Sequence, residues 1–167
     1  LGTLQANRPL IVTDPFMIDS GKITAVTDPL NEAGIAFDVF SQTVPDPTTD
    51  IVNAGVKILR EGDFDCLIAL GGGSPIDTAK AMNILYVIGG VIRDHKVPSQ
   101  PNDPVLPLIA IPTTAGTGSE ATKVVVRAET ATDEKMLIMG LSCLPAAALV
   151  DYTLTFSGPF RTTADTG

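Results

Sequence analysis

Four consecutive small residues, Gly71-Gly72-Gly73-Ser74, have the composition of a phosphate-binding turn. Glycine lets the backbone turn sharply and leaves no Cβ atom in the way of a ligand. The turn follows an apolar run at 65–70, which has the length of a buried strand, and it precedes an apolar segment with helical spacing. Because the first N–H groups of a helix are unpaired and carry a partial positive charge, this arrangement predicts an anion site.

The helix after the turn is expected to begin with Ser74 as its N-cap and Pro75 at its first position. Its buried face is expected to be a single apolar stripe, made by Ala81, Ile84, Leu85 and Ile88. Asp77 is predicted to cap the backbone or to accept a hydrogen bond from a hydroxyl or amide of the ligand, since a carboxylate competes with phosphate for the same field. A tight turn without a ligand is the alternative.

The turn does not match the common glycine motifs. G-x-G-x-x-G requires glycine where Ile76 stands, and the Gly-Lys-Ser/Thr of a P-loop does not occur in the chain. G-x-S-x-G fails because Pro75 occupies the place of its last glycine.

Apolar strand-like runs alternate with helical stripes, which predicts parallel strands joined by right-handed crossovers. We therefore expect one α/β domain over residues 1–167, with a doubly wound, mainly parallel sheet and helices on both faces. The expected strands are 9–13, 35–40, 65–70, 106–111 and 146–150, and segments 122–127 and 135–139 are expected to form a hairpin.

Three helices are expected besides the one after the glycine turn. The first ends at Gly34 and contains Pro29, which should kink or shorten it. The next carries an apolar stripe that consists of Val52, Gly55, Val56 and Leu59. The segment 158–167 is expected to start the last.

Ligands of an open α/β sheet bind outside the carboxyl ends of its strands. Those ends carry the glycine turn, a hydroxyl-rich loop at 113–117, and the acids Asp14 and Asp151, a set that suits a dinucleotide better than a mononucleotide or free phosphate. Asp14 could hold a ribose diol and repel a 2′-phosphate, or it could cap a turn or helix before Pro15. In a Rossmann unit the acid follows the glycines by ~20 residues, whereas Asp14 precedes them, so a different binding mode is expected.

Composition excludes several partners. The net charge is -8, without a cluster of Lys or Arg, which argues against nucleic acid. No apolar run is long enough to span a membrane and the first residues do not resemble a signal peptide, so a cytoplasmic location is expected. Cys66 and Cys143 are expected to be buried thiols. The only histidine, His95, is expected to be exposed, and no metal site is predicted.

Two long motifs resemble the cofactor-domain signatures of the iron-dependent (group III) alcohol dehydrogenases. They are Gly-Gly-Gly-Ser-Pro-Ile-Asp-Thr-Ala-Lys at 71–80 and Ile-Pro-Thr-Thr-Ala-Gly-Thr-Gly-Ser-Glu at 111–120. Segments 133–136 and 163–167 are similar to later landmarks of the family, so the resemblance covers essentially the whole chain. It implies an N-terminal NAD(P)-binding domain, followed beyond Gly167 by a helical domain that holds the iron or zinc ligands.

By this resemblance, the pyrophosphate is bound by Gly72, Gly73 and Ser74, and Asp14 contacts the adenosine ribose and favours NAD over NADP. The remaining residues implied to line the cofactor are Thr113, Thr114 and Thr122, with Lys135 nearby and Leu154 beside the adenosine. From the residues alone, Lys135 is expected to be a solvated lysine at a strand end rather than a cation that faces the ligand. Ala121 and Arg127 depart from the family pattern.

The implied function is an NAD(P)-dependent oxidoreductase that acts on primary alcohols or hydroxy acids, with a small alcohol or aldehyde as the substrate. This chain would supply the dinucleotide-binding half, inactive by itself, of an enzyme expected to be a homo-oligomer. The alternatives are a glycerol or sugar-phosphate dehydrogenase, a dehydroquinate-synthase-like enzyme, and a non-catalytic nucleotide-binding module.

Overall fold

A parallel five-stranded sheet forms the centre of the molecule in a computed structural model that describes residues 1–128 and 135–157. The strand order is β2-β1-β3-β4-β7, and every neighbouring pair is parallel. The strands are β1 (Pro9–Val12), β2 (Asp38–Phe40), β3 (Cys66–Gly71), β4 (Leu108–Pro112) and β7 (Ala147–Ala148). The predicted doubly wound fold is confirmed.

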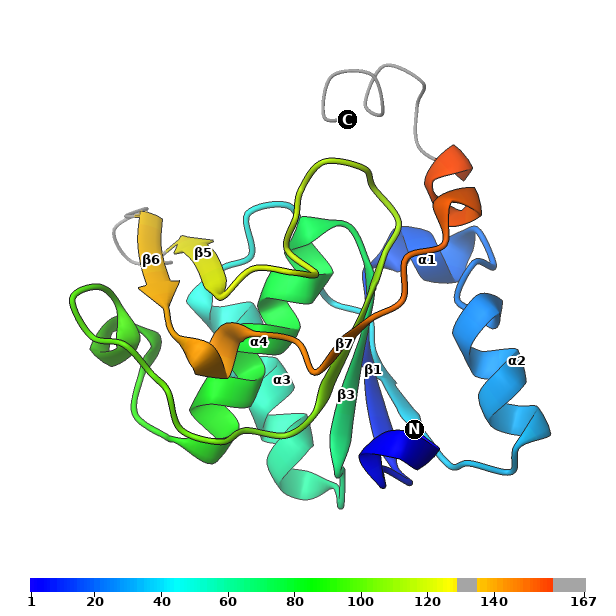
Figure 1. Cartoon of the computed structure of the whole chain (residues 1–167), viewed down its shortest axis with the longest axis horizontal. Coiled ribbons are helices and arrows are strands. Elements are labelled where there is room, and N and C mark those ends of the chain that lie inside the picture. The colour runs from blue at the N-terminus through cyan, green and yellow to red at the C-terminus, as the bar shows by residue number, and fades with distance from the viewer. Residues whose placement is uncertain (129–134, 158–167) are drawn as a thin grey trace.

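Helices cover both faces of the sheet (Figure 1). One face carries α1 (Pro15–Asp19) and α2 (Thr24–Glu32), and the other carries α3 (Thr49–Glu61) and α4 (Gly73–Val87). The predicted hairpin is confirmed as the antiparallel pair β5 (Val124–Ala128) and β6 (Lys135–Met139). Short 3₁₀ helices complete the described chain: η1 (Gly2–Leu4), η2 (Ile92–His95), η3 (Leu141–Cys143) and η4 (Tyr152–Ser157).

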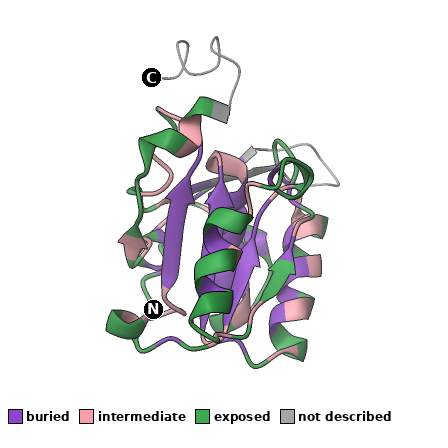
Figure 2. Ribbon diagram, turned by 90° about the vertical axis from the view of Figure 1, so that its right-hand side faces the viewer, coloured by how far each residue is buried: buried purple, intermediate pink, exposed green. Residues whose placement is uncertain are grey.

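The core has two halves because alternate strand residues point to opposite faces of the sheet. In β3, Leu67 and Ala69 pack with α3 and α4, whereas Ile68 and Leu70 pack with α1 and α2. The central strands are buried on both sides, as Figure 2 shows. Burial on both faces explains why these strands are nearly continuous apolar runs in the sequence.

Helix α4 is the most buried helix of the fold. Pro75, Ile76 and all of residues 78–85 are buried, so the prediction of a single apolar face is wrong. The physical reason is that α4 contacts the sheet, α3, η3 and β5, which together surround it. The residues that would normally face water on a surface helix, including Lys80 and Asn83, are therefore enclosed by protein.

Two expectations about strands need correction. The strand expected at 35–40 is shorter, and only Asp38–Phe40 pairs with β1. The buried strand expected at 146–150 is a two-residue edge strand, Ala147–Ala148, followed by exposed residues. It lies at the end of the sheet and pairs only with β4 among the described strands, so one of its sides has no strand to cover it.

The helix expected around Pro29 is not shortened by it. Helix α2 contains Pro29 and continues to Glu32, and the Pro29 carbonyl accepts the N–H of Ala33 at 3.1 Å. Proline deprives the carbonyl of Ala25, four residues earlier, of its helical donor. Because both residues are exposed, water can satisfy that carbonyl. The helix expected to begin in 158–167 lies outside the described residues.

No helix within 1–128 and 135–157 is long and apolar enough to cross a membrane.

The close contact between α3 and α4 depends on the absence of a side chain at Gly55. A Cβ atom there would clash with Sδ of Met82 and would lie 2.6 Å from its Cε atom. We expect Gly55→Val to lower the free energy of unfolding by about 1–3 kcal/mol through overpacking. Combining it with Met82→Ala should cost less than the sum of the two single changes, because valine fills part of the space that methionine leaves.

Chemical denaturation followed by circular dichroism measures these free energies. Asn53→Val, at an exposed position of the same helix, controls for the introduction of a β-branched side chain into α3. An effect of Gly55→Val no larger than that of Asn53→Val would contradict the packing argument.

Candidate functional site

The strand order places two candidate segments side by side at one edge of the sheet. The chain passes from β1 to β2 on one side, whereas β3 pairs with β1 on the other side, so the order reverses between β1 and β3. Asp14 lies two residues after the end of β1, and Gly72 directly follows β3. Both lie at the carboxyl ends of these strands, which is the switch point where open α/β sheets bind ligands.

Buried threonines fix the carboxyl ends of these strands to one another. Thr13 donates from Oγ1 to the Leu70 carbonyl at 2.8 Å, and Thr43 donates from Oγ1 to the Thr13 carbonyl at 2.7 Å. The backbone N–H of Thr113 donates to the Gly71 carbonyl at 2.9 Å. Sequence reasoning found Thr113 and missed the other two. Thr13 had a detectable signal, because a hydroxyl residue there directly ends an apolar strand.

The glycine turn is packed tightly on both sides. Gly71 has φ +144°, and a Cβ atom on it would lie 2.6 Å from Cγ of Pro75 and 3.3 Å from Oδ2 of Asp14. A Cβ on Gly72 would lie 3.2 Å from Oγ1 of Thr114. The turn therefore has the Asp14 carboxylate on one side and the loop after β4 on the other.

The N-terminus of α4 differs from the prediction. Gly72, not Ser74, is the N-cap, so the helix begins earlier and Pro75 stands at its third position. Because the N-cap is a glycine, no side chain at the cap position accepts a hydrogen bond from the first backbone N–H groups. Asp77 is the fifth residue of the helix, two positions further from the N-cap than expected, and it is partly buried.

A hydroxyl beside this helix start also has an unused hydrogen-bonding capacity. Oγ1 of Thr114 is buried and makes no hydrogen bond to any residue in the described part of the chain. Buried polar atoms are normally hydrogen-bonded, so one without a partner next to a helix N-terminus indicates a place for a polar ligand. The residues at this turn therefore fit a bound phosphate group.

Asp14 serves as the cap of another helix, one of the two roles considered for it. Its Oδ1 atom accepts the backbone N–H of Met17 at 3.0 Å, at the start of α1. Its Oδ2 atom is the one that faces Gly71. The carboxylate is partly exposed, so it can cap α1 with one oxygen and present the other to a ligand.

The other predicted residues lie on different sides of the turn. Thr122 precedes β5, and its carbonyl accepts a hydrogen bond at 2.7 Å from Nζ of Lys80, a fully buried lysine that sequence reasoning missed. The signal for Lys80 was a lone charge between Ala79 and Ala81 in an apolar helix. Lys135 is the first residue of β6. Leu154 lies in η4 and packs against the apolar cluster on the α1 and α2 face.

Three residues with potential chemistry are buried away from solvent. The expectation of an exposed His95 is wrong, because it is 8% exposed with Nε2 2.8 Å from the Gly89 carbonyl. Cys66 and Cys143 are confirmed as buried free thiols. Burial, assisted by the nearby charge of Asp65, raises the pKa of Cys66 to about 12, and burial raises the pKa of Cys143 to about 11. Within the described residues, no group of His, Cys, Asp or Glu could hold a metal ion.

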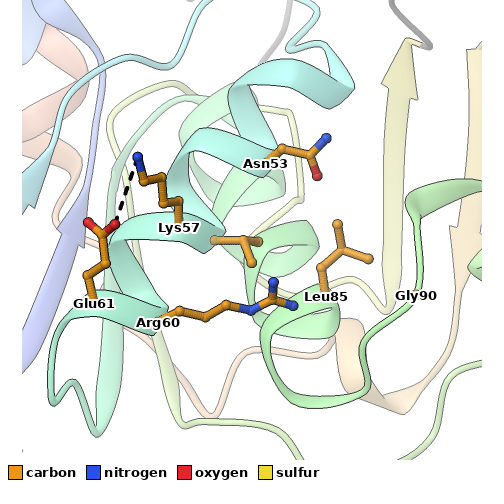
Figure 3. A pocket seen from close by; sticks show the side chains of 7 residues that line it. Asn53, Lys57, Arg60, Glu61, Leu85 and Gly90 are labelled. Atoms are coloured by element: carbon orange, nitrogen blue, oxygen red, sulfur yellow. Dashed lines mark ion pairs between the residues drawn. The ribbon is translucent and has the colours of Figure 1, made fainter.

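A pocket of about 350 Å³ lies elsewhere, between the last turns of α3 and α4 (Figure 3). Lys57 and Arg60 line it, and Lys57 is paired with Glu61 at 3.8 Å. Helix C-termini carry a partial negative charge that disfavours phosphate. The two cations offset this charge, so their presence here is explained without a bound anion. The glycine turn lies at the opposite end of α4 and remains the stronger candidate.

Comparison with known proteins decides the family. The profile of the family described as iron-containing alcohol dehydrogenase matches residues 1–152. The chain belongs to the iron-containing alcohol dehydrogenase family. Its sequence is 37% identical over 167 residues to the NAD-dependent methanol dehydrogenase of Bacillus methanolicus and 35% identical over 162 residues to the lactaldehyde reductase of Escherichia coli K12.

Solved structures of this family have the same fold. A 1,3-propanediol oxidoreductase superposes with a TM-score of 0.93 at 31% identity, covering 99% of this chain and 43% of that one. The sulfoacetaldehyde reductase of Bifidobacterium kashiwanohense, solved in complex with NAD+, has a TM-score of 0.90 at 33% identity and covers 99% of this chain and 44% of that one. This chain also spans only 44% of the methanol dehydrogenase and 42% of the lactaldehyde reductase, although it matches them over 100% and 96% of its own length.

The reactivity of the two cysteines tests whether their thiols are buried and protonated in the folded chain. Because both are buried and have raised pKa values, we expect neither to react with an aromatic disulfide reagent at pH 8 while the chain is folded. Both should react at once in guanidinium chloride, where they are exposed. Absorbance of the released thiolate measures this, and rapid labelling of the folded chain would show an accessible thiolate that the structure does not contain.

Proposed function

We propose that this chain binds NAD and supplies the dinucleotide-binding part of an oxidoreductase that interconverts small alcohols with their aldehydes or ketones. The observation that carries the proposal is the uncapped N-terminus of α4 at the switch point of the sheet, beside the partly exposed carboxylate of Asp14. The family membership supports it, as do a relative named NAD-dependent and a similar structure solved with NAD+. We also propose that the enzyme has a further part that binds a metal ion, and that it is a homo-oligomer.

In this function the glycine turn would receive the pyrophosphate. The pyrophosphate oxygens would accept hydrogen bonds from the backbone N–H groups of Gly73 and Ser74, and the helix dipole would favour their negative charge. The unused hydroxyl of Thr114 would donate to a ligand oxygen. Oδ2 of Asp14 would accept hydrogen bonds from the two ribose hydroxyls, which leaves Oδ1 to cap α1.

The cofactor itself supplies the hydride acceptor when it is bound. This chain's part is to hold that acceptor in one orientation. The glycine turn and Asp14 would fix one half of the dinucleotide, and the loop after β4 would confine the other half. The described residues contain no cluster of metal ligands, and both cysteines are buried, so the proposal assigns a bond-making role to neither cysteine.

The proposal is tested by calorimetric titration with NAD, AMP and inorganic phosphate. We expect NAD to bind most tightly of the three. We expect Gly73→Val to lower the affinity for NAD by about tenfold or more, because a branched side chain would occupy the place of the phosphate. Gly2→Val is the matched control, since a Cβ on Gly2 meets no atom within 4 Å. If the folded Gly73→Val chain bound NAD with the same affinity as the unaltered chain, the assignment would be contradicted. If the chain bound NAD no more tightly than inorganic phosphate, a simple phosphate-binding module would be favoured instead.

Cofactor preference depends on the charge of Asp14. We expect Asp14→Asn to narrow the preference for NAD over NADP by about 1 kcal/mol, since it removes the repulsion of a 2′-phosphate while an amide oxygen still caps α1. Asp28→Asn, which removes an exposed acid from α2, controls for net charge. Dissociation constants for both cofactors and the melting temperature are measured together. An unchanged ratio would leave Asp14 as a helix cap only.

A further inference from the structure

Lys80 is a fully buried lysine in the middle of α4. Its Nζ atom donates to the Thr122 carbonyl at 2.7 Å and to the Val124 carbonyl at 3.1 Å, and it lies 3.4 Å from Oγ1 of Thr122. A buried ammonium group is costly to desolvate unless hydrogen bonds compensate. These bonds therefore hold the end of a loop more than 40 residues away against the helix.

The loop in question, 113–122, is anchored at both ends to the elements that form the glycine turn. At its start, the N–H of Thr113 donates to the Gly71 carbonyl at 2.9 Å, and at its end Lys80 holds Thr122. Between these anchors the loop contains two left-handed glycines, Gly116 and Gly118, so its own backbone does not restrict it to one path.

Between its anchors the loop lies against the glycine turn. A Cβ atom on Gly72 would lie 3.2 Å from Oγ1 of Thr114, and one on Gly73 would lie 3.3 Å from Oγ of Ser119. The loop thus borders the space in front of the helix N-terminus, with Thr114 next to the anchor at Thr113 and Ser119 nearer to the end that Lys80 holds. Figure 1 shows it as the yellow-green segment above the start of α4.

We propose that Lys80 is a positioning residue that fixes the 113–122 loop and thereby sets the affinity for the half of the dinucleotide beyond the pyrophosphate. This inference rests on the proposed function and goes beyond it, since Lys80 would not touch the ligand. The sheet order β1-β3-β4 puts Asp14, the glycine turn and the loop in a row. A ligand with its adenosine ribose at Asp14 and its pyrophosphate at the turn has its remaining half over the loop.

ADP ends at the pyrophosphate and therefore separates this role from general destabilisation. Lys80→Met keeps the length of the side chain and removes its donors. We expect it to weaken the affinity for NAD by about tenfold or more and to leave the affinity for ADP within about twofold, because the hydrogen bonds to the end of the loop at Thr122 and to the start of β5 are lost, whereas the anchor at Thr113 remains. Lys57→Met, on the exposed side of α3, is the matched control and should change neither. Circular dichroism checks that each variant is folded.

Two results overturn the inference while leaving the proposed function intact: Lys80→Met binds NAD as tightly as the unaltered chain, or it loses NAD and ADP equally. Failure of the unaltered chain to bind NAD overturns the proposed function instead. If Lys80→Met does not fold, amide hydrogen exchange of the unaltered chain tests the inference instead. We expect NAD, but not ADP, to slow the exchange of the amides of residues 113–123. Equal protection by ADP would contradict the assignment of this loop to the far half of the dinucleotide.

Discussion

The site depends on one constraint, a helix start that no side chain caps. The first N–H groups of α4 would be unfavourable in a closed interior, because unpaired backbone donors are costly to bury. They are tolerated here because the helix begins at the open carboxyl edge of the sheet, where water or a ligand can reach them. Gly71, with φ +144°, turns the chain from β3 into this position, and the carboxylate of Asp14 lies beside it.

A helix start can hold a ligand in a fixed place only if the helix itself is rigid. Helix α4 satisfies this because the sheet, α3, η3 and β5 surround it, and Gly55 lets α3 approach closely at Met82. Complete burial also encloses Lys80, whose hydrogen bonds carry that rigidity to the loop on the other side of the site. Packing, polar satisfaction and the shape of the ligand space are thus determined by the same helix.

Much of this arrangement could be predicted from sequence, because it rests on local patterns. Strand-length apolar runs and the glycine turn indicated the parallel sheet, and the carboxyl-end rule brought Asp14 and the turn to one edge. The burial of α4 could not be predicted from its own residues, since it depends on a hairpin more than 35 residues further along the chain. The same holds for Lys80, His95 and Thr43, whose partners are carbonyl groups of other segments. The cap was misplaced because Ser74-Pro75 is a good helix start in isolation, whereas tertiary packing starts the helix earlier.

The most direct test of this account is a crystal structure of the chain with NAD bound. We expect the diphosphate at the start of α4, within hydrogen-bonding distance of the backbone N–H groups of Gly73 and Ser74. We expect a ribose on Oδ2 of Asp14 and the other half of the dinucleotide against the 113–122 loop. A diphosphate bound away from that helix start, for example in the pocket between the ends of α3 and α4, would contradict it.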